Sequence, residues 1–172
     1  GAMNTITGVA DAMMDSTPIV VICGQVGAAM LGTDAFQEVD VVGVTQPITK
    51  WNYQIRRAED IPWAVARAFY IARSGRPGPV VLDFAKNAQT AVIDYQPQSI
   101  DFIRSYKPVH KPSDETIRKA AEMINESVKP FMLVGQGVEL AGANKELLEL
   151  CEKAQIPLGK NMIGLSAEPS EH

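Results

Sequence analysis

Short apolar runs alternate with amphipathic segments along the chain. The apolar runs are rich in Val and Ile and are too short for buried helices, which is typical of strands covered on both faces. The segments between them repeat apolar residues at helical spacing. The pattern predicts strands at residues 18–23, 41–44, 80–84, 131–134 and from 156 onward, and helices at 7–15, 34–38, 60–74, 114–127 and 143–154. Strands that alternate with helices in this way predict a parallel α/β fold.

The clearest helix is expected from Asp60 to Ser74. Asp60 suits the N-cap position and Pro62 suits the first turn. Gly75 can adopt the left-handed conformation that ends a helix. The apolar run that follows then predicts a buried strand.

The character of the sequence changes after residue 89. Polar residues and three prolines dominate as far as residue 112, which is typical of a linker. We therefore expect residues 1–90 to form part of one domain, residues 91–112 to link, and residues 113–172 to begin a second domain. Neither part is long enough for a whole doubly wound domain. A first residue other than methionine also favours a piece of a longer protein.

Composition and charge exclude several classes of partner. Apolar residues make up 46% of the 172 residues and charged residues 21%, which is ordinary for a globular protein. The net charge of −4, with both signs interspersed, excludes the basic face of a nucleic-acid site. No apolar run approaches the roughly 18 residues of a membrane span. The chain has two cysteines. Because Cys23 lies in an apolar run, we interpret it as a small buried hydrophobic residue in preference to a disulfide partner or metal ligand. This usage fits a reducing cytoplasm.

Ligands of parallel α/β sheets collect at the carboxyl ends of the strands. Three loops follow predicted strands and are therefore candidate ligand-binding loops. They are Gly24–Gly27, Ala85–Asn87 and Gly135–Gly137. The last allows close approach of a ligand to the backbone, although a bare GxG is more often a simple turn.

Two cationic residues flank the strand at 80–84. Lys86 at its carboxyl end could hold a carboxylate or phosphate, or could simply be solvated. Pro77 pushes Arg76 toward extended backbone, so the guanidinium is presented from a stiff platform. The alternative is that the prolines only end a helix and start a strand.

Other catalytic constellations are missing from the sequence. The two histidines, His110 and His172, do not form a dyad, and no cluster has metal-ligand spacing. No serine sits in a GxSxG elbow. Trp51, Trp63 and Tyr70 are interpreted as packing residues.

Three stretches resemble the large, catalytic subunits of the acetolactate synthase (acetohydroxyacid synthase) family. They are GVADAMMDSTPIVVICGQV, GTDAFQEVDVVGVTQPITKWN and AFYIARSGRPGPVVLDFAKN. The later stretch PFMLVGQGVELAGANKELLELCEKAQIPLGKNMIGL looks like the opening of that family's central domain. The resemblance implies the C-terminal part of a thiamine-enzyme pyrimidine-binding domain, followed by the first part of a Rossmann-like central domain.

The resemblance also assigns expected roles to individual residues. Gln37 and Phe36, in DAFQE, are similar to active-site residues near the reacting end of the thiamine cofactor, and Lys86 matches the lysine of the active-site entrance. Ser16 and Arg76 fall on positions that contact FAD. Gly135 and Gln136 fall on the central-domain loop near FAD. No metal ligand is expected within this chain.

For the full-length parent, the resemblance implies thiamine diphosphate, Mg²⁺ and FAD. It implies condensation of pyruvate with pyruvate or 2-ketobutyrate after thiamine-dependent decarboxylation, in branched-chain amino-acid biosynthesis. Expected partners are the 2-ketoacid, further catalytic subunits in a homo-oligomer and a possible small regulatory subunit.

Two alternatives stay open. One is another FAD- and thiamine-dependent 2-ketoacid enzyme, of the glyoxylate carboligase or pyruvate oxidase type. The other is a non-catalytic nucleotide-binding module. Because the family's activating glutamate and diphosphate motif lie outside this sequence, we expect the piece alone to be inactive. An incomplete sheet also predicts that it dimerises or rearranges.

Overall fold

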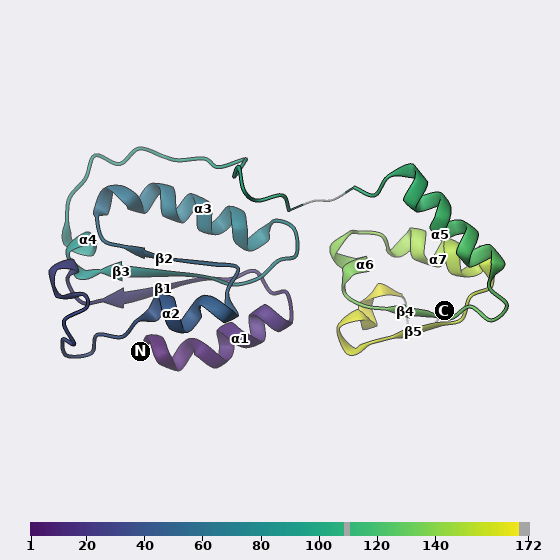
Figure 1. Cartoon of the computed structure of the whole chain (residues 1–172), viewed down its shortest axis with the longest axis horizontal. Coiled ribbons are helices and arrows are strands. Elements are labelled where there is room, and N and C mark those ends of the chain that lie inside the picture. The colour runs from purple at the N-terminus through teal and green to yellow at the C-terminus, as the bar shows by residue number, and fades with distance from the viewer. Residues whose placement is uncertain (109–110, 169–172) are drawn as a thin grey trace. The chain divides into compact units, whose positions relative to one another are not determined.

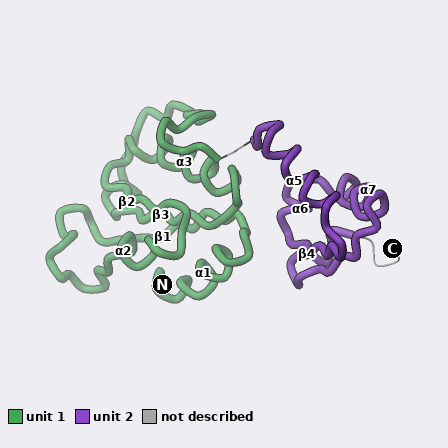
Figure 2. The backbone as a smooth tube through the Cα atoms, turned by 45° about the vertical axis from the view of Figure 1, so that its right-hand side comes forward, with its two compact units in different colours: residues 1–110 green, residues 111–172 purple. Residues whose placement is uncertain are grey.

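The computed structural model describes residues 1–108 and 111–168. The chain divides into two compact units, residues 1–110 and residues 111–172 (Figure 2). His110 and His172 lie outside the described residues, so the expectation that neither is catalytic stays a prediction.

A three-stranded parallel sheet forms the centre of the first unit. Its strands are β1 (Val20–Gln25), β2 (Trp51–Ile55) and β3 (Val80–Ala85), in the order β1-β3-β2. All six residues of β3 are buried, because this strand is central and covered on both faces. The parallel α/β class predicted from the sequence is confirmed.

Helices cover both faces of this sheet. Figure 1 shows α3 (Ile61–Arg73) on one side, with α1 (Ile6–Met14) and α2 (Val41–Thr45) on the other. The small residues of α3 allow it to approach β3 closely, and they share one apolar cluster with Val80 and Leu82. The opposite cluster joins Val9 and Val41 to Cys23 and Val81. Shorter helical segments are α4 (Lys86–Thr90), η1 (Ala2–Thr5), η2 (Ala28–Met30), η3 (Gln46–Ile48) and η4 (Ala58–Asp60).

The expectation of a strand at residues 41–44 is wrong. This segment forms α2, because the Asp40 side chain accepts a hydrogen bond from Gly43 N at 2.8 Å and caps a helix there. The second strand of the unit is instead β2, which the sequence reading missed. Its residues alternate apolar and polar side chains, since it lies at an edge of the sheet.

The helix expected from Asp60 is confirmed as α3, with Pro62 in its first turn and Gly75 in the left-handed region at φ +61°. The expected cap is wrong in detail. The Asp60 side chain makes no cap hydrogen bond and lies 3.7 Å from Nη2 of Arg57 instead. The helical turn expected at residues 34–38 is also wrong, since Asp34 and Gln37 both have positive φ.

The segment after α4 packs partly on the first unit. Ile103 is buried in the cluster under α3. The Tyr106 hydroxyl donates to Ser74 O at 2.9 Å and accepts from Lys50 Nζ at 3.0 Å. The part of the expected linker around these two residues therefore belongs to the structure of the first unit.

Aromatic residues expected to pack do so. Trp51 stacks on Tyr53 with 5.5 Å between ring centroids, and Trp63 meets both rings edge-on. Tyr70 packs edge-on against Tyr106. These contacts confirm the packing interpretation.

The second unit is built on two parallel strands, β4 (Met132–Val134) and β5 (Leu158–Lys160). Its helices are α5 (Asp114–Glu126), α6 (Gly137–Leu140), α7 (Asn144–Ala154) and η5 (Met162–Ala167). The Ser113 side chain caps α5 by accepting from Thr116 N at 3.2 Å.

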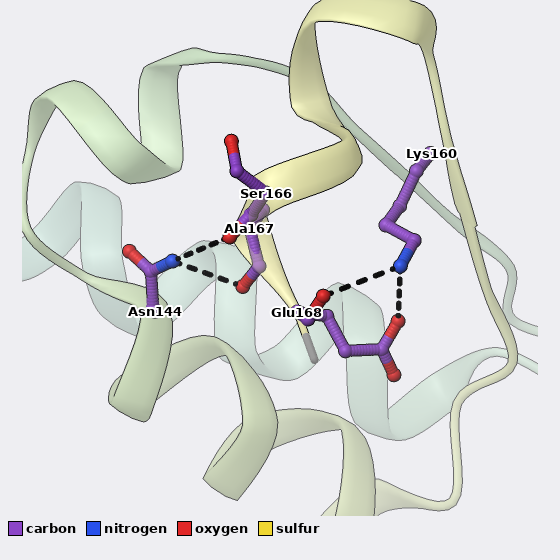
Figure 3. A network of polar contacts seen from close by, with 5 residues as sticks. All are labelled: Asn144, Lys160, Ser166, Ala167 and Glu168. Carbon is purple, nitrogen blue, oxygen red and sulfur yellow. Dashed lines mark hydrogen bonds and ion pairs between the residues drawn. The ribbon is translucent and has the colours of Figure 1, made fainter. Parts of the chain in front are cut away.

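Polar contacts tie the end of η5 to the rest of the second unit (Figure 3). Asn144 Nδ2 donates to the backbone oxygens of Ser166 and Ala167 at 3.2 and 3.1 Å. Lys160 Nζ lies 3.1 Å from a carboxylate oxygen of Glu168, and both side chains are largely buried. This partial burial strengthens the pair relative to an exposed one.

Replacing Gly75 by alanine should destabilise the first unit. A Cβ at this residue would lie 2.9 Å from Pro108 O, and the backbone is left-handed. We expect Gly75→Ala to lower the free energy of unfolding by about 1–2 kcal/mol in urea titrations. Gly27→Ala is the control, since Gly27 has negative φ and open space around its Cβ position. Equal stability of the two variants would contradict the assigned strain.

Candidate functional site

The carboxyl ends of the three strands meet at one edge of the first sheet. Gln25 at the end of β1 pairs with Ala85 at the end of β3, and Ile55 of β2 pairs with Phe84. The arrowheads in Figure 1 mark this edge. The loops after all three strands therefore start side by side, where parallel sheets bind their ligands.

Asn87 holds these loops together. Its Oδ1 accepts from Ala28 N at 2.8 Å, and its Nδ2 donates to Arg56 O at 2.9 Å. One side chain after β3 thus reaches the loop after β1 and the loop after β2. The sequence reading missed this role, since a single asparagine after a strand carries no such signal.

Lys86 begins α4 at the same edge and is exposed. Its backbone N–H donates to Val26 O at 3.3 Å. The contact fixes the lysine backbone beside the β1 loop, while the ammonium group stays available to an incoming anion. The arrangement is compatible with the entrance role expected for Lys86, which stays a prediction.

Glu38 organises the loop after β1. Its carboxylate accepts hydrogen bonds from the backbone N–H groups of Gly32, Thr33 and Ala35, the last two at 3.3 and 3.2 Å. These backbone donors, led by that of Gly32, lower the pKa of Glu38 below its usual value. The acidic residue at the end of DAFQE thus replaces the helical hydrogen bonds expected there.

Gln37 occupies a strained position in this loop, with φ at +59°. Such a conformation in a residue other than glycine is uncommon and is often kept at functional sites. Phe36 beside it is 87% exposed. An exposed phenylalanine of this size favours contact with a ligand or another protein surface.

A hollow of about 310 Å³ lies beside Gln37. It is lined by Gly1, Ala2, Met3, Gly24, Gln25, Gln37, Val39 and Val41. This mixture of amide, backbone and apolar groups fits a neutral organic ring. None of the lining side chains named here is cationic, so the hollow does not fit a diphosphate group.

A buried polar cluster lies beneath the loops. Asp83, in the middle of β3, is 0% exposed, and its Oδ2 accepts from Gln25 Nε2 at 3.2 Å and Gln54 Nε2 at 3.0 Å. Burial raises the pKa of Asp83, with a further contribution from the charge of Asp40, while the two glutamine donors oppose the shift. Burial likewise raises the pKa of Cys23 nearby, which leaves an unreactive thiol.

Ser16 and Arg76 are brought together at the opposite edge of the sheet. They precede β1 and β3, and Arg76 Nε donates to Ser16 Oγ at 2.8 Å. Nη2 of Arg76 also donates to the carbonyl oxygens of Met13 and Met14 at 3.2 and 3.0 Å. The guanidinium thereby caps the end of α1, which sequence reasoning did not anticipate. Their predicted contact with FAD stays a prediction.

Gly135 and Gln136 follow β4 in the second unit. A Cβ on Gly135 would lie 3.1 Å from Nδ2 of Asn161, so the small residue allows close packing of this loop. Gln136 precedes α6 without making a side-chain cap. Their predicted place near FAD stays a prediction, as does the absence of a metal ligand from this chain.

Residues 1–108 and 111–168 contain no group of three or more His, Cys, Asp or Glu side chains gathered as a metal site would require. No helix within these ranges is long and apolar enough to cross a bilayer.

Comparison with known families identifies two domain types. The family described as "Thiamine pyrophosphate enzyme, N-terminal TPP binding domain" matches residues 1–44, and "Thiamine pyrophosphate enzyme, central domain" matches residues 117–172. The two domain types expected from the resemblance are thereby confirmed.

Curated relatives match over the entire chain. The acetolactate synthase isozyme 1 large subunit of Escherichia coli is 46% identical over 172 residues, which is 100% of this chain and 30% of the relative. The acetolactate synthase large subunit of Corynebacterium glutamicum is 44% identical, covering 100% of this chain and 28% of the relative. The large subunit from Lactococcus lactis is 42% identical, at 100% and 30%. The chain thus spans less than a third of the length of these relatives.

The raised pKa of Asp83 predicts a pH dependence of stability. Because the folded pKa exceeds the unfolded value of about 4, folding favours the protonated carboxyl, and Asp83 costs stability as pH rises through the folded pKa. We expect Asp83→Asn to gain stability relative to the parent as pH rises from about 4 toward neutral, in urea titrations. The exposed Asp94→Asn should show no such trend. A difference for Asp83→Asn that is flat or falls with pH would refute the assignment.

Proposed function

We propose that this chain, which matches two domain types of thiamine pyrophosphate enzymes, is a segment of the large catalytic subunit of an acetolactate synthase. The observation that carries the proposal is identity of 42–46% over the whole chain to proteins of that name. We propose that the full-length protein condenses pyruvate with pyruvate or 2-ketobutyrate, in branched-chain amino-acid biosynthesis. The shared name favours this activity over the glyoxylate carboligase and pyruvate oxidase types.

The hollow beside Gln37 is proposed to receive the ring portion of thiamine diphosphate. The cofactor supplies the electron sink that decarboxylation of a 2-ketoacid needs. The Gln37 amide can donate to or accept from a neutral group in the hollow, and its fixed backbone limits the entropy lost on binding. Phe36, next to Gln37 in the chain, is proposed to exclude water from the reacting region of the full-length protein. The diphosphate and Mg²⁺ are proposed to be held by parts of the full-length protein other than this hollow.

Lys86 is proposed to attract the carboxylate of the incoming 2-ketoacid. Its exposed ammonium stands at the edge of the sheet that carries the Gln37 loop. A compact cation at an entrance raises the local concentration of an anionic substrate. This role needs no contact with the reacting carbon atoms.

FAD is proposed to contact the Ser16–Arg76 pair, with Arg76 reached from solvent and Ser16 buried behind it. The guanidinium is exposed, and two of its nitrogens already donate to Ser16, Met13 and Met14. The third nitrogen, Nη1, remains for a polar group of the cofactor. In the second unit, Gly135 and Gln136 are likewise proposed to contact FAD.

The partners proposed for the full-length protein are further catalytic subunits and a small regulatory subunit. The name "large subunit" of the relatives supports the latter. A cytoplasmic location is proposed from cysteine usage alone.

The proposed activity is tested by expressing the full-length gene. The assay measures acetolactate formed from pyruvate in the presence of thiamine diphosphate, Mg²⁺ and FAD. We expect turnover for the full-length protein and none for the chain alone.

Gln37→Ala in the full-length protein should lower kcat by roughly 10–100-fold, because the amide beside the reacting group is lost. The matched control is Gln46→Ala, since Gln46 is an exposed glutamine at the start of η3. Steady-state kinetics with pyruvate measures both variants. A Gln37→Ala enzyme with parental kcat would remove Gln37 from the proposed site.

Arg76→Met should lower FAD affinity by about tenfold, since one charged hydrogen-bond donor is removed. It should also lower the free energy of unfolding by about 1–2 kcal/mol, because α1 loses its cap. Arg73→Met, at the exposed last turn of α3, is the control for loss of charge. Fluorescence titration of FAD and urea unfolding separate the two effects. Unchanged FAD affinity with reduced stability would leave Arg76 as a helix cap alone.

A further inference from the structure

A buried carboxylate stands where a parallel sheet normally carries an apolar side chain. Asp83 lies fully buried on the central strand β3, between Leu82 and Phe84 in the chain and opposite Cys23 and Gln54 on the neighbouring strands. Burying a charge of this kind costs several kcal/mol unless it is well paired. Its Oδ1 has no hydrogen-bond partner among the described residues, so the fold does not fully compensate that cost. An apolar residue of similar size would satisfy the core better, which favours a role beyond packing.

The hydrogen bonds of Asp83 lead to both neighbouring strands. Oδ2 accepts from Gln25 at the end of β1 and from Gln54 near the end of β2. The two contacts differ in what lies beyond them. Gln54 accepts from the exposed Arg56 Nε at 2.9 Å, whereas Gln25 contacts the loop that holds Gln37.

Gln25 closes that loop at both ends. Its Nε2 donates to Val39 O at 2.8 Å, and its Oε1 accepts from Val26 N at 2.9 Å. Val26 is the first residue after β1, and Val39 comes two residues after Gln37. The side chain of Gln25 is only 9% exposed, so water competes little for these bonds.

The amide of Gln25 can bond in this way only in one orientation. Nε2 must face both Val39 O and Asp83, while Oε1 must face Val26 N. Val39 O and Val26 N set that orientation, and the carboxylate oxygen of Asp83 adds a second acceptor for Nε2, because it accepts and cannot donate when ionised. With an apolar residue at position 83, Nε2 would lose this second acceptor, which is the one that ties the amide to the central strand.

We propose that Asp83 is a positioning residue that, through Gln25, holds the ends of the 26–39 loop together and thereby sets the position of Gln37 over the hollow. This inference rests on the proposed function for the catalytic meaning of Gln37. Glu38 shapes the loop from within, and Asp83 anchors it from below. Asp83 itself need not touch substrate or cofactor.

The first arm of the test is amide hydrogen exchange of residues 26–39 in this chain. Asp83→Leu and Gln25→Leu should each raise exchange across the loop by about tenfold, since its closure becomes a local opening. Asp83→Asn keeps one oxygen acceptor for both glutamines and should stay near the parent. Gln54→Leu is the matched control, because it removes the other donor to the same oxygen without touching the loop. Parental exchange in Gln25→Leu, or equal effects of Gln25→Leu and Gln54→Leu, would overturn the proposal.

The second arm is kinetic and uses the full-length protein. Asp83→Leu should lower kcat about tenfold with KM for pyruvate within about twofold, because a misplaced Gln37 weakens the transition state more than substrate binding. Asp83→Asn should restore kcat. If Asp83 acts through Gln25, the double variant Asp83→Leu/Gln25→Leu should be no slower than Gln25→Leu alone. Additive losses would assign Asp83 a separate structural role and overturn the proposal.

Failure of the proposed function can be distinguished from failure of the positioning role of Asp83. If the unmodified full-length protein forms no acetolactate, the proposed function fails, and the exchange arm still decides whether Asp83 orders the loop. If acetolactate forms but the exchange pattern contradicts the closure, only the positioning role of Asp83 is lost. Should Asp83→Leu not fold, Gln25→Leu at the edge of the sheet carries both arms.

Discussion

The parallel register between β3 and its two neighbours is the constraint on which the rest of the first unit depends. It places the ends of three strands at one edge, so loops distant in sequence start from adjacent positions. Burial of all six residues of β3 on both faces keeps this register from slipping. Asn87 then converts adjacency into direct contact by bonding to the loops after β1 and β2. The candidate site therefore depends first on strand pairing, which brings its loops together, and only then on individual side chains.

Two carboxylates do different work at this edge. Glu38 is exposed to its own loop and gathers backbone donors, which favours its charged form. Burial disfavours the charged form of Asp83, and the two glutamine amides that donate to it oppose this effect. Glu38 provides an acceptor for backbone N–H groups that a regular helix would otherwise bond, whereas Asp83 provides an acceptor for two side chains. A loop with positive φ at Asp34 and Gln37 needs such external partners, because its own backbone cannot satisfy itself.

The sequence predicted the elements whose signals are local. Val80–Phe84 and the helix before it carry period and stop signals that no distant contact overrides, although the expected Asp60 cap is not formed. Three of the four residues at 41–44 are valine, yet the Asp40 cap and the cover needed by Val81 make this segment a helix. Strand β2 was missed because an edge strand with polar alternation resembles a loop in a single sequence. Lys86 and Arg76 stood out by their positions beside a predicted strand, and Gln37 stood out only by family resemblance. The contacts made by Asn87 and Gln25 arise only once the strands are paired.

The two edges of the sheet differ in whether their charged and aromatic side chains are bound by the chain itself or left exposed. At the amino edge, Arg76 serves the protein itself by completing α1, so any cofactor there meets a guanidinium already fixed by three acceptors. At the carboxyl edge, Phe36 and Lys86 are exposed and satisfy little within the chain. A preordered cation suits a cofactor that stays bound, because the ordering cost is met on folding. Exposed groups above a fixed frame suit molecules that enter and leave. The division follows from where each residue falls relative to β1 and β3.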